Sequence, residues 1–161
     1  MFKNLFKKTK KVTEEVVYAP VNGEIVDITD ASDPTFAEKL LGDGIAIEPS
    51  DGEFVSPVNG EIINIFPTKH AIGILSEAGV EYLIHIGVDT VSLDGEGFTA
   101  HIKQGDKVKV GDPLVSVDLG FVASKAKTIT PMVITNEVHS IDKELNQQVS
   151  KGETKILTVH L

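Results

Sequence analysis

Short apolar runs, broken by turn residues at regular intervals, constrain the fold of this chain more than any other feature. From residue 16 onward, runs rich in Val and Ile are separated by Gly, Pro, Asn and Asp, at a spacing of roughly eight to twelve residues. Only two short stretches, 32–42 and 120–127, have a helical pattern. We therefore expect an all-β protein, an antiparallel β-sandwich or barrel-sandwich with a few short helices.

A ten-residue pattern occurs twice in the first half of the chain. The sequence APVNGEIVDI (19–28) recurs as SPVNGEIINI (56–65), an offset of 37 residues. In each copy Pro-Val-Asn-Gly favours a turn, and Glu-Ile begins the next apolar run. The pattern predicts two strand-turn-strand units related by an internal pseudo-repeat.

Charge divides the chain into a basic start and an acidic body. All fifteen cations are Lys, and five of them lie in the first eleven residues, which hold no acid. The other 150 residues carry ten Lys against 24 acids, a net charge of −14. We expect residues 1–16 to be a flexible or amphipathic basic tail that can make weak membrane contact, and residues 17–161 to be a single domain.

The residue types that the chain lacks exclude several classes of functional site. The absence of Cys excludes disulfides, zinc-thiolate sites and a thiol nucleophile. There is no signal peptide and no long apolar run, so a cytoplasmic location is expected. The acidic body disfavours nucleic acid and favours a basic partner. Because Arg is also absent, any Arg clamp for phosphate must come from another protein.

Two histidines, His70 and His85, flank a stretch that is typical of a strand, a turn and a second strand. If an even-length loop centred between Glu77 and Ala78 closes the hairpin, the two histidines face each other. Ile72 and Leu83 would then form the next pair, an apolar floor. An odd-length loop would shift the register by one residue and stagger the histidines.

Paired imidazoles on an apolar face have a chemical use. Two cationic rings repel each other, so at least one is neutral near pH 7 and keeps a nucleophilic nitrogen, while the other can donate a hydrogen bond to developing charge. These properties suit the acceptance of a phosphoryl group on nitrogen. Thr68 is placed to fix the second nitrogen of His70, and Asp89 is expected near the rim of the site.

Other interpretations of the histidines compete with this one. His101, His139 and His160 are expected to be structural, hydrogen-bonded residues. A metal site has only two His and no Cys to draw on, so we expect none within the chain; zinc could be held by His70 and His85 only with a carboxylate from a partner. No cofactor is expected.

Several stretches resemble one known family. These are APVNGEI, FAEKLLGDGIAIEP, PTKHAIGI, YLIHIGVDTVSLDGEGF, GDKVKVGDPL and TPMVITN, which occur in this order from about Val17 to the C-terminus. Together they are similar to the glucose-family IIA (EIIA) proteins of the bacterial phosphoenolpyruvate-dependent sugar phosphotransferase system. The resemblance implies a single β-sandwich-like domain. It also implies a histidine that accepts a phosphoryl group from phospho-HPr and passes it to a cysteine of a IIB domain during sugar uptake.

The same resemblance assigns roles to residues of this chain. It implies that His85 is phosphorylated through Nε2, as part of a phosphotransferase of the EC 2.7.1 type. His70 would stabilise the phosphorylated state, and Thr68 would orient His70. Replacement of His85 should abolish acceptance, whereas replacement of His70 should impair onward transfer.

Partner contacts are also implied by the resemblance. Phe36 and Phe66 resemble the apolar ring around the family's site, and we expect Phe36 at the surface because it lies on a short helix beside Pro34. Asp33 and Asp89 resemble acids that meet a basic partner. The partners would be phospho-HPr, the IIB domain of a glucose-type permease and, in the unphosphorylated form, regulatory target proteins. This would place the protein in the cytoplasm, at or near the inner face of the membrane.

Two other classes of protein share parts of this pattern. APVNGEI and KQGDKVKVGDPLV resemble turns of biotinyl and lipoyl carrier modules, but neither the Met-Lys-Met nor the Asp-Lys-Ala setting of a modified Lys occurs. A zinc peptidase of related β-architecture is the second alternative. An intact mass without a prosthetic group would argue against the carrier, and failure to bind zinc or cleave peptides would argue against the peptidase.

Overall fold

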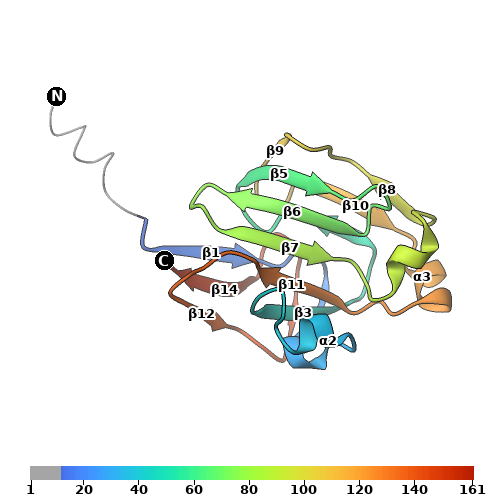
Figure 1. Cartoon of the computed structure of the whole chain (residues 1–161), viewed down its shortest axis with the longest axis horizontal. Coiled ribbons are helices and arrows are strands. Elements are labelled where there is room, and N and C mark those ends of the chain that lie inside the picture. The colour runs from blue at the N-terminus through green and yellow to red at the C-terminus, as the bar shows by residue number, and fades with distance from the viewer. Residues whose placement is uncertain (1–11) are drawn as a thin grey trace, which may run out of the picture.

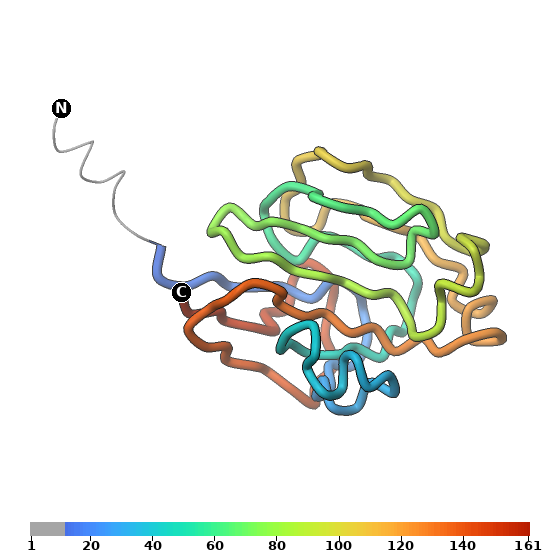
Figure 2. Tube along the Cα trace, in the orientation of Figure 1, coloured from blue at the N-terminus to red at the C-terminus, as the bar shows by residue number. Residues whose placement is uncertain are grey.

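The computed structural model describes residues 12–161, and antiparallel strands dominate it (Figure 1). One sheet has the order β1-β14-β12, a second β4-β10-β8, and the largest β13-β2-β3-β11-β7-β6-β5-β9. Figure 2 shows the chain running back and forth in long hairpins, with the C-terminus beside the first strand. The predicted β-sandwich with few short helices is confirmed.

The elements have the following bounds. The strands of the first half are β1 (Glu14–Tyr18), β2 (Gly23–Asp27), β3 (Gly44–Pro49), β4 (Glu53–Val55), β5 (Gly60–Ile65), β6 (Ala71–Ser76) and β7 (Glu81–His85). Those of the second half are β8 (Phe98–Ala100), β9 (Lys107–Val108), β10 (Pro113–Val117), β11 (Thr130–Ile134), β12 (Ser140–Lys143), β13 (Gln147–Val149) and β14 (Lys155–His160). The helices are the 3₁₀ turns η1 (Ile28–Asp30) and η2 (Thr90–Leu93), and α2 (Pro34–Ala37) and α3 (Leu119–Lys125).

The sequence repeat is also a repeat in space. The Tyr18 amide donates to the Pro57 carbonyl at 3.0 Å, and the Val55 amide donates to the Pro20 carbonyl at 2.7 Å. Each donor and each acceptor is shifted by the same 37 residues as the sequence pattern, so the two hydrogen bonds are reciprocal. The predicted internal pseudo-repeat is therefore present, with its two copies packed directly against each other.

The repeated asparagines do more than form turns. The Asn22 Oδ1 accepts the Lys151 amide at 2.8 Å, and the Asn59 Oδ1 accepts the Val110 amide at 2.9 Å. Each Asn thus joins its own turn to a loop more than fifty residues later. Such long-range side-chain bonds satisfy loop amides that no strand ladder covers.

Apolar residues form one large core and a smaller cluster that matters for the site. The large core includes Tyr82, Phe54 and the buried isoleucines of β5, β6 and β7. The smaller cluster consists of Ile28, Ala31, Phe36 and Val133, with Leu83 packed against it. Because side chains alternate along a strand, β7 contributes Ile84 to the large core and Leu83 to the smaller cluster.

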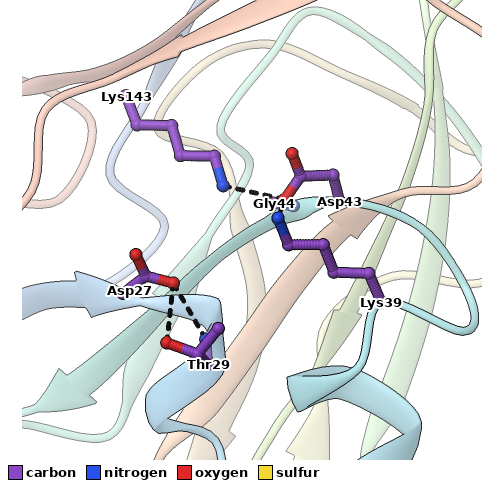
Figure 3. A network of polar contacts seen from close by, with 6 residues as sticks. All are labelled: Asp27, Thr29, Lys39, Asp43, Gly44 and Lys143. Carbon is purple, nitrogen blue, oxygen red and sulfur yellow. Dashed lines mark hydrogen bonds and ion pairs between the residues drawn. The ribbon is translucent and has the colours of Figure 1, made fainter.

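An ionic network anchors the connection that follows α2. Figure 3 shows Lys143 of β12 and Lys39 both directed at Asp43, next to the start of β3. Lys143 Nζ lies 2.7 Å and Lys39 Nζ 3.6 Å from Asp43 Oδ1. Burial alone would raise the pKa of Asp43, but the bond and charge of Lys143, the Gly44 amide and the charge of Lys39 together lower it. In the same network Asp27 caps η1 by accepting the Thr29 amide.

The N-terminal boundary differs from the expected one. Strand β1 begins at Glu14, whose register partner on β14 is His160, so residues 14–16 belong to the sheet rather than to a tail. The basic tail expected further upstream falls on residues 1–11, outside the described part of the chain. Among residues 12–161, no helix is long and apolar enough to cross a membrane.

Candidate functional site

The hairpin of β6 and β7 sets the positions of both central histidines, and its register differs from the even-loop expectation. Three residues, 77–79, separate the hydrogen-bonded pair Ser76 and Val80, and Gly79 adopts a φ of +90°. This odd-length loop, with Gly in the left-handed position, pairs His85 with Ala71 rather than with His70. The predicted direct opposition of the two histidines is therefore wrong by one residue.

The imidazole rings meet nonetheless, because His70 lies outside the regular strand. The chain turns between Phe66 and Lys69, where the Lys69 amide donates to the Phe66 carbonyl and Lys69 has a φ of +63°. His70 follows this turn, and its carbonyl accepts the Ile86 amide. The rings of His70 and His85 lie with centroids 4.8 Å apart at an interplanar angle of 78°.

The expected apolar floor is also rearranged. Ile72 pairs with Ile84, and Leu83 pairs with Gly73, so Ile72 and Leu83 are not opposed. Ile72 lies in the large core, whereas Leu83 packs on the smaller cluster. The one-residue shift explains this separation, since it moves the two side chains to opposite faces of the sheet.

Two phenylalanines supply the apolar walls instead. Phe36 lies 5.0 Å from the His85 ring and Phe66 5.5 Å from the His70 ring, measured between centroids. Phe36 is only 3% exposed, which corrects the prediction of a surface position: it is the one buried residue of α2 and packs in the smaller cluster. Phe66 is 40% exposed and remains accessible to a partner.

His70 is buried and held through one nitrogen. The Thr68 Oγ1 lies 2.6 Å from His70 Nδ1, the contact that the sequence predicted. A hydroxyl can donate or accept, so this bond is compatible with either tautomer of the ring. Burial, with a smaller contribution from the nearby His85, lowers the pKa of His70 from 6.5 to about 4. His70 is therefore neutral at pH 7.

His85 is held in a different way. Its Nδ1 lies 2.7 Å from the Gly87 carbonyl oxygen. A carbonyl can only accept, so Nδ1 carries the proton and Nε2 keeps a free electron pair. Burial lowers the pKa of His85, while the Gly87 carbonyl and the carboxylates of Asp33 and Asp89 act in the opposite direction. The resting ring is a neutral nucleophile at Nε2.

Asp33 and Asp89 lie beside His85 on two different turns. Asp33 caps α2 by accepting the Thr35 amide at 2.9 Å, and Asp89 precedes η2 with a φ of +66°. They line the same hollow of about 320 Å³ together with Ser32, Pro34, Val88 and Lys127. The two carboxylates therefore place negative charge near His85, with one cation, Lys127, in the same hollow.

Comparisons with known proteins agree on one family. The family model of the phosphoenolpyruvate-dependent sugar phosphotransferase system, EIIA 1, matches residues 15–140. The chain belongs to this EIIA family. It is 52% identical to a PTS system glucose-specific EIIA component of Halalkalibacterium halodurans, with 99% of this chain and 98% of the relative covered. A Staphylococcus epidermidis protein of the same name is 49% identical at the same coverage.

A solved structure gives the same result at the level of the fold. The glucose permease IIA from Mycoplasma capricolum superposes with a TM-score of 0.87 at 39% identity, covering 91% of this chain and 96% of the solved one. The family predicted from sequence motifs is thereby confirmed. As an EIIA protein, the chain is a phosphotransfer component of a sugar transport system.

The remaining histidines of this EIIA chain lie elsewhere. His101 Nε2 lies 2.7 Å from Ser116 Oγ, and His160 Nε2 lies 2.7 Å from Asp142 Oδ2, so both rings are hydrogen-bonded as expected of structural residues. The His139 amide donates to the His160 carbonyl. Among the described residues, no three His, Cys, Asp or Glu side chains are grouped to hold a metal ion, so zinc at His70 and His85 would need a carboxylate from a partner.

Sequence reasoning missed the backbone partner of His85. The Gly two residues after the histidine, in the segment HIGVDT, carries the carbonyl that fixes the ring, and Gly87 has a φ of +76°. A Gly so soon after a strand was the available signal, because a left-handed residue can turn its carbonyl back toward the preceding side chain. The buried Thr90 and Thr130 that hold this Gly had no comparable sequence signal.

Proposed function

We propose that this EIIA protein is the phosphocarrier of a glucose-type permease. It takes a phosphoryl group from phospho-HPr on His85 Nε2 and passes it to a cysteine of a IIB domain. The observation that carries the proposal is the bond from His85 Nδ1 to the Gly87 carbonyl, which leaves Nε2 unprotonated on a neutral ring. A neutral imidazole with a fixed tautomer is the nucleophile that such a transfer needs.

The transfer consists of two displacements on phosphorus. The His85 Nε2 electron pair attacks the phosphorus of the donor phosphohistidine, and the donor's N–P bond breaks with its electrons returning to the donor ring. In the second step a thiolate of the IIB domain attacks the same phosphorus, and the His85 N–P bond breaks. The electron pair returns to Nε2, so His85 is regenerated and needs no cofactor.

His70 is proposed to stabilise the phosphoryl group while it resides on His85. With Nδ1 against Thr68, the other nitrogen of His70 is left to interact with neighbouring groups, and the two rings are in contact distance. If Thr68 donates to Nδ1, Nε2 of His70 carries a proton and can donate to an anionic phosphoryl oxygen. Hydrogen bonds aimed at developing negative charge in a dry site are among the strongest contributions to catalysis.

The surface around the histidines suits basic partners. Asp33 and Asp89 are acidic, Phe66 is half-exposed, and the chain has no Arg of its own. We propose that HPr and the IIB domain bring cations that pair with these acids and neutralise the phosphoryl charge during transfer. Phe36 would act from beneath, as a wall for His85, rather than by touching a partner.

Two further expectations belong to this proposal. When the protein is unphosphorylated, the same surface would bind regulatory target proteins. A carrier that serves a membrane permease would work in the cytoplasm at the inner face of the membrane, where residues 1–11 supply five Lys.

Phosphoryl uptake tests the function directly. The purified chain is incubated with phosphoenolpyruvate, enzyme I and HPr, and its intact mass is recorded before and after acid treatment. The expected result is an acid-labile gain of one phosphoryl group, which is lost again on addition of a IIB domain. No gain, with the donor proteins shown to be active on another EIIA protein, would refute the proposal.

A further inference from the structure

Two buried threonines hold the first of the two peptide units that flank Gly87. In the unit joining Ile86 to Gly87, the Ile86 carbonyl accepts the Thr90 hydroxyl at 2.7 Å, and the Gly87 amide donates to Thr130 Oγ1 at 3.3 Å. Thr90 and Thr130 are both 0% exposed. Neither threonine touches a histidine through these bonds, so their effect on the site passes through the backbone.

The second peptide unit carries the acceptor of His85. Here the Val88 amide donates to the Lys127 carbonyl at 3.0 Å, and the Gly87 carbonyl accepts His85 Nδ1–H at 2.7 Å. All four polar groups of the two units therefore have partners. The direction of the Gly87 carbonyl is set on one side by the isolated β-bridge between Val88 and Lys127 and on the other by the two threonines.

Gly87 has no side chain to restrict its backbone conformation, and the structure leaves no room for one. Its φ of +76° is a conformation that other residues rarely adopt. A Cβ at this position would lie 2.5 Å from the Lys127 carbonyl oxygen and 2.6 Å from Thr90 Cγ2. The conformation of this flexible residue must be fixed by its neighbours, and the threonines supply that restraint.

The role of the Thr130 hydroxyl is defined by its second bond. Its proton goes to the Thr128 carbonyl at 2.9 Å, so Oγ1 presents electron pairs to the Gly87 amide. Valine has nearly the same shape but no acceptor, and would leave a buried amide unpaired, which is costly in a dry environment. The cheapest relief is a rotation of the Gly87 peptide units, which would also turn the carbonyl away from His85.

We infer that Thr130, together with Thr90, is a positioning residue for phosphoryl transfer: through Gly87 the two hydroxyls keep the proton of His85 on Nδ1 and the electron pair on Nε2. The effect of these two threonines on phosphoryl transfer rests on the proposed function. The tautomer itself is a property of the resting protein and can be measured without any donor.

The test compares Thr130→Val and Thr130→Ser with the wild type and with Ser76→Ala. Ser76 is a matched control because it is also buried and accepts a backbone amide, that of Val80, at the opposite end of the same hairpin. The tautomer of His85 is measured by long-range ¹H–¹⁵N NMR of the labelled ring, and acceptance by rapid-quench transfer from phospho-HPr.

We expect the wild type, Thr130→Ser and Ser76→Ala to hold the proton on Nδ1. Thr130→Val should show a mixture with the Nε2–H tautomer and accept the phosphoryl group about tenfold more slowly, in line with the loss of an orienting partner. A Thr130→Val protein with the wild-type tautomer and rate would overturn the inference, as would a wild-type ring protonated at Nε2.

A second pair of variants covers the case in which Thr130→Val does not fold. Thr90→Val should shift the tautomer in the same direction, and Thr90→Ser should restore it; an unchanged ring in Thr90→Val would then count against the inference. Failure of the proposed function looks different. In that case the wild type takes up no phosphoryl group, while the dependence of the His85 tautomer on the threonines remains.

Discussion

The two central histidines are chemically alike, but their hydrogen-bond partners restrict their tautomers to different degrees. His85 is held at Nδ1 by the Gly87 carbonyl, and His70 is held at Nδ1 by the Thr68 hydroxyl. A carbonyl accepts only, whereas a hydroxyl can also donate. The tautomer of His85 is therefore fixed, and that of His70 can change without breaking its hydrogen bond.

This difference matches the demands of the proposed reaction. The nucleophile must present the same electron pair in every cycle, so a fixed tautomer is an advantage. A lone pair at His85 Nε2 and an anionic phosphoryl group both call for a hydrogen-bond donor on the supporting ring. The Thr68 hydroxyl can donate to His70 Nδ1 and so leave the proton on Nε2, whereas an acceptor-only partner would draw that proton to Nδ1.

Removal of the nucleophile should have the largest effect. His85→Ala should abolish phosphoryl acceptance, because no other ring nitrogen occupies its place. Intact mass after incubation with phospho-HPr checks this expectation. His101→Ala is the matched control, since His101 is hydrogen-bonded on the surface at Ser116 and should leave uptake unchanged. A phosphorylated His85→Ala protein would contradict the assignment of roles.

Removal of the supporting ring should separate the two half-reactions. His70→Ala should still accept the phosphoryl group, while onward transfer to a IIB domain falls by about a hundredfold because a hydrogen bond to the transferred group is lost. Single-turnover measurements of each step give the two rates. His70→Gln, which keeps an N–H donor, should recover part of the second rate; equal slowing of both steps by His70→Ala would argue against distinct roles.

Removal of the Thr68 hydroxyl should slow onward transfer less than removal of the His70 ring that it holds. Thr68→Val leaves His70 Nδ1 without its partner at 2.6 Å and should slow onward transfer by about tenfold. Thr68→Ser keeps the hydroxyl and should remain close to the wild type. The same single-turnover assay decides, and a Thr68→Ser protein as slow as Thr68→Val would show that the methyl group, not the hydroxyl, is what matters.

The overall fold was accessible from the sequence because its signals are local and repeated. The spacing of turn residues predicted the strands, and PVNGEI predicted the pseudo-repeat that the reciprocal bonds of Tyr18 and Val55 establish. The family followed from the motifs around His85 and is supported by the comparisons.

The details of the site were less accessible, because they depend on geometry between distant segments. The register of the hairpin changed with one residue of loop length, and the burial of Phe36 depended on a cluster with Ile28 and Val133. The restraint on Gly87 comes from Thr130, 43 residues away in the chain. No local pattern carries such information. The contact of Thr68 with His70 was predictable because the two residues are only two positions apart in the chain.

The contrast between the histidines also predicts how stability depends on pH. The pKa of His70 is lowered from 6.5 to about 4 by burial and by His85. Above pH 6.5 the ring is neutral in both the folded and the unfolded chain and makes no difference. As the pH falls from 6.5 towards 4, the unfolded chain takes up a proton that folded His70 does not, so the free energy of unfolding decreases.

His70→Gln removes this proton uptake and should flatten the acid side of the stability curve. Relative to pH 7, the variant should gain on the order of 2 kcal/mol over the wild type at about pH 5, where the unfolded histidine is charged and the folded one is not. Urea unfolding at several pH values measures the difference. His101→Gln, at an exposed ring, controls for the substitution itself. A parallel pair of curves for wild type and His70→Gln would mean that folding does not lower the pKa of His70, and would contradict the burial argument for this ring.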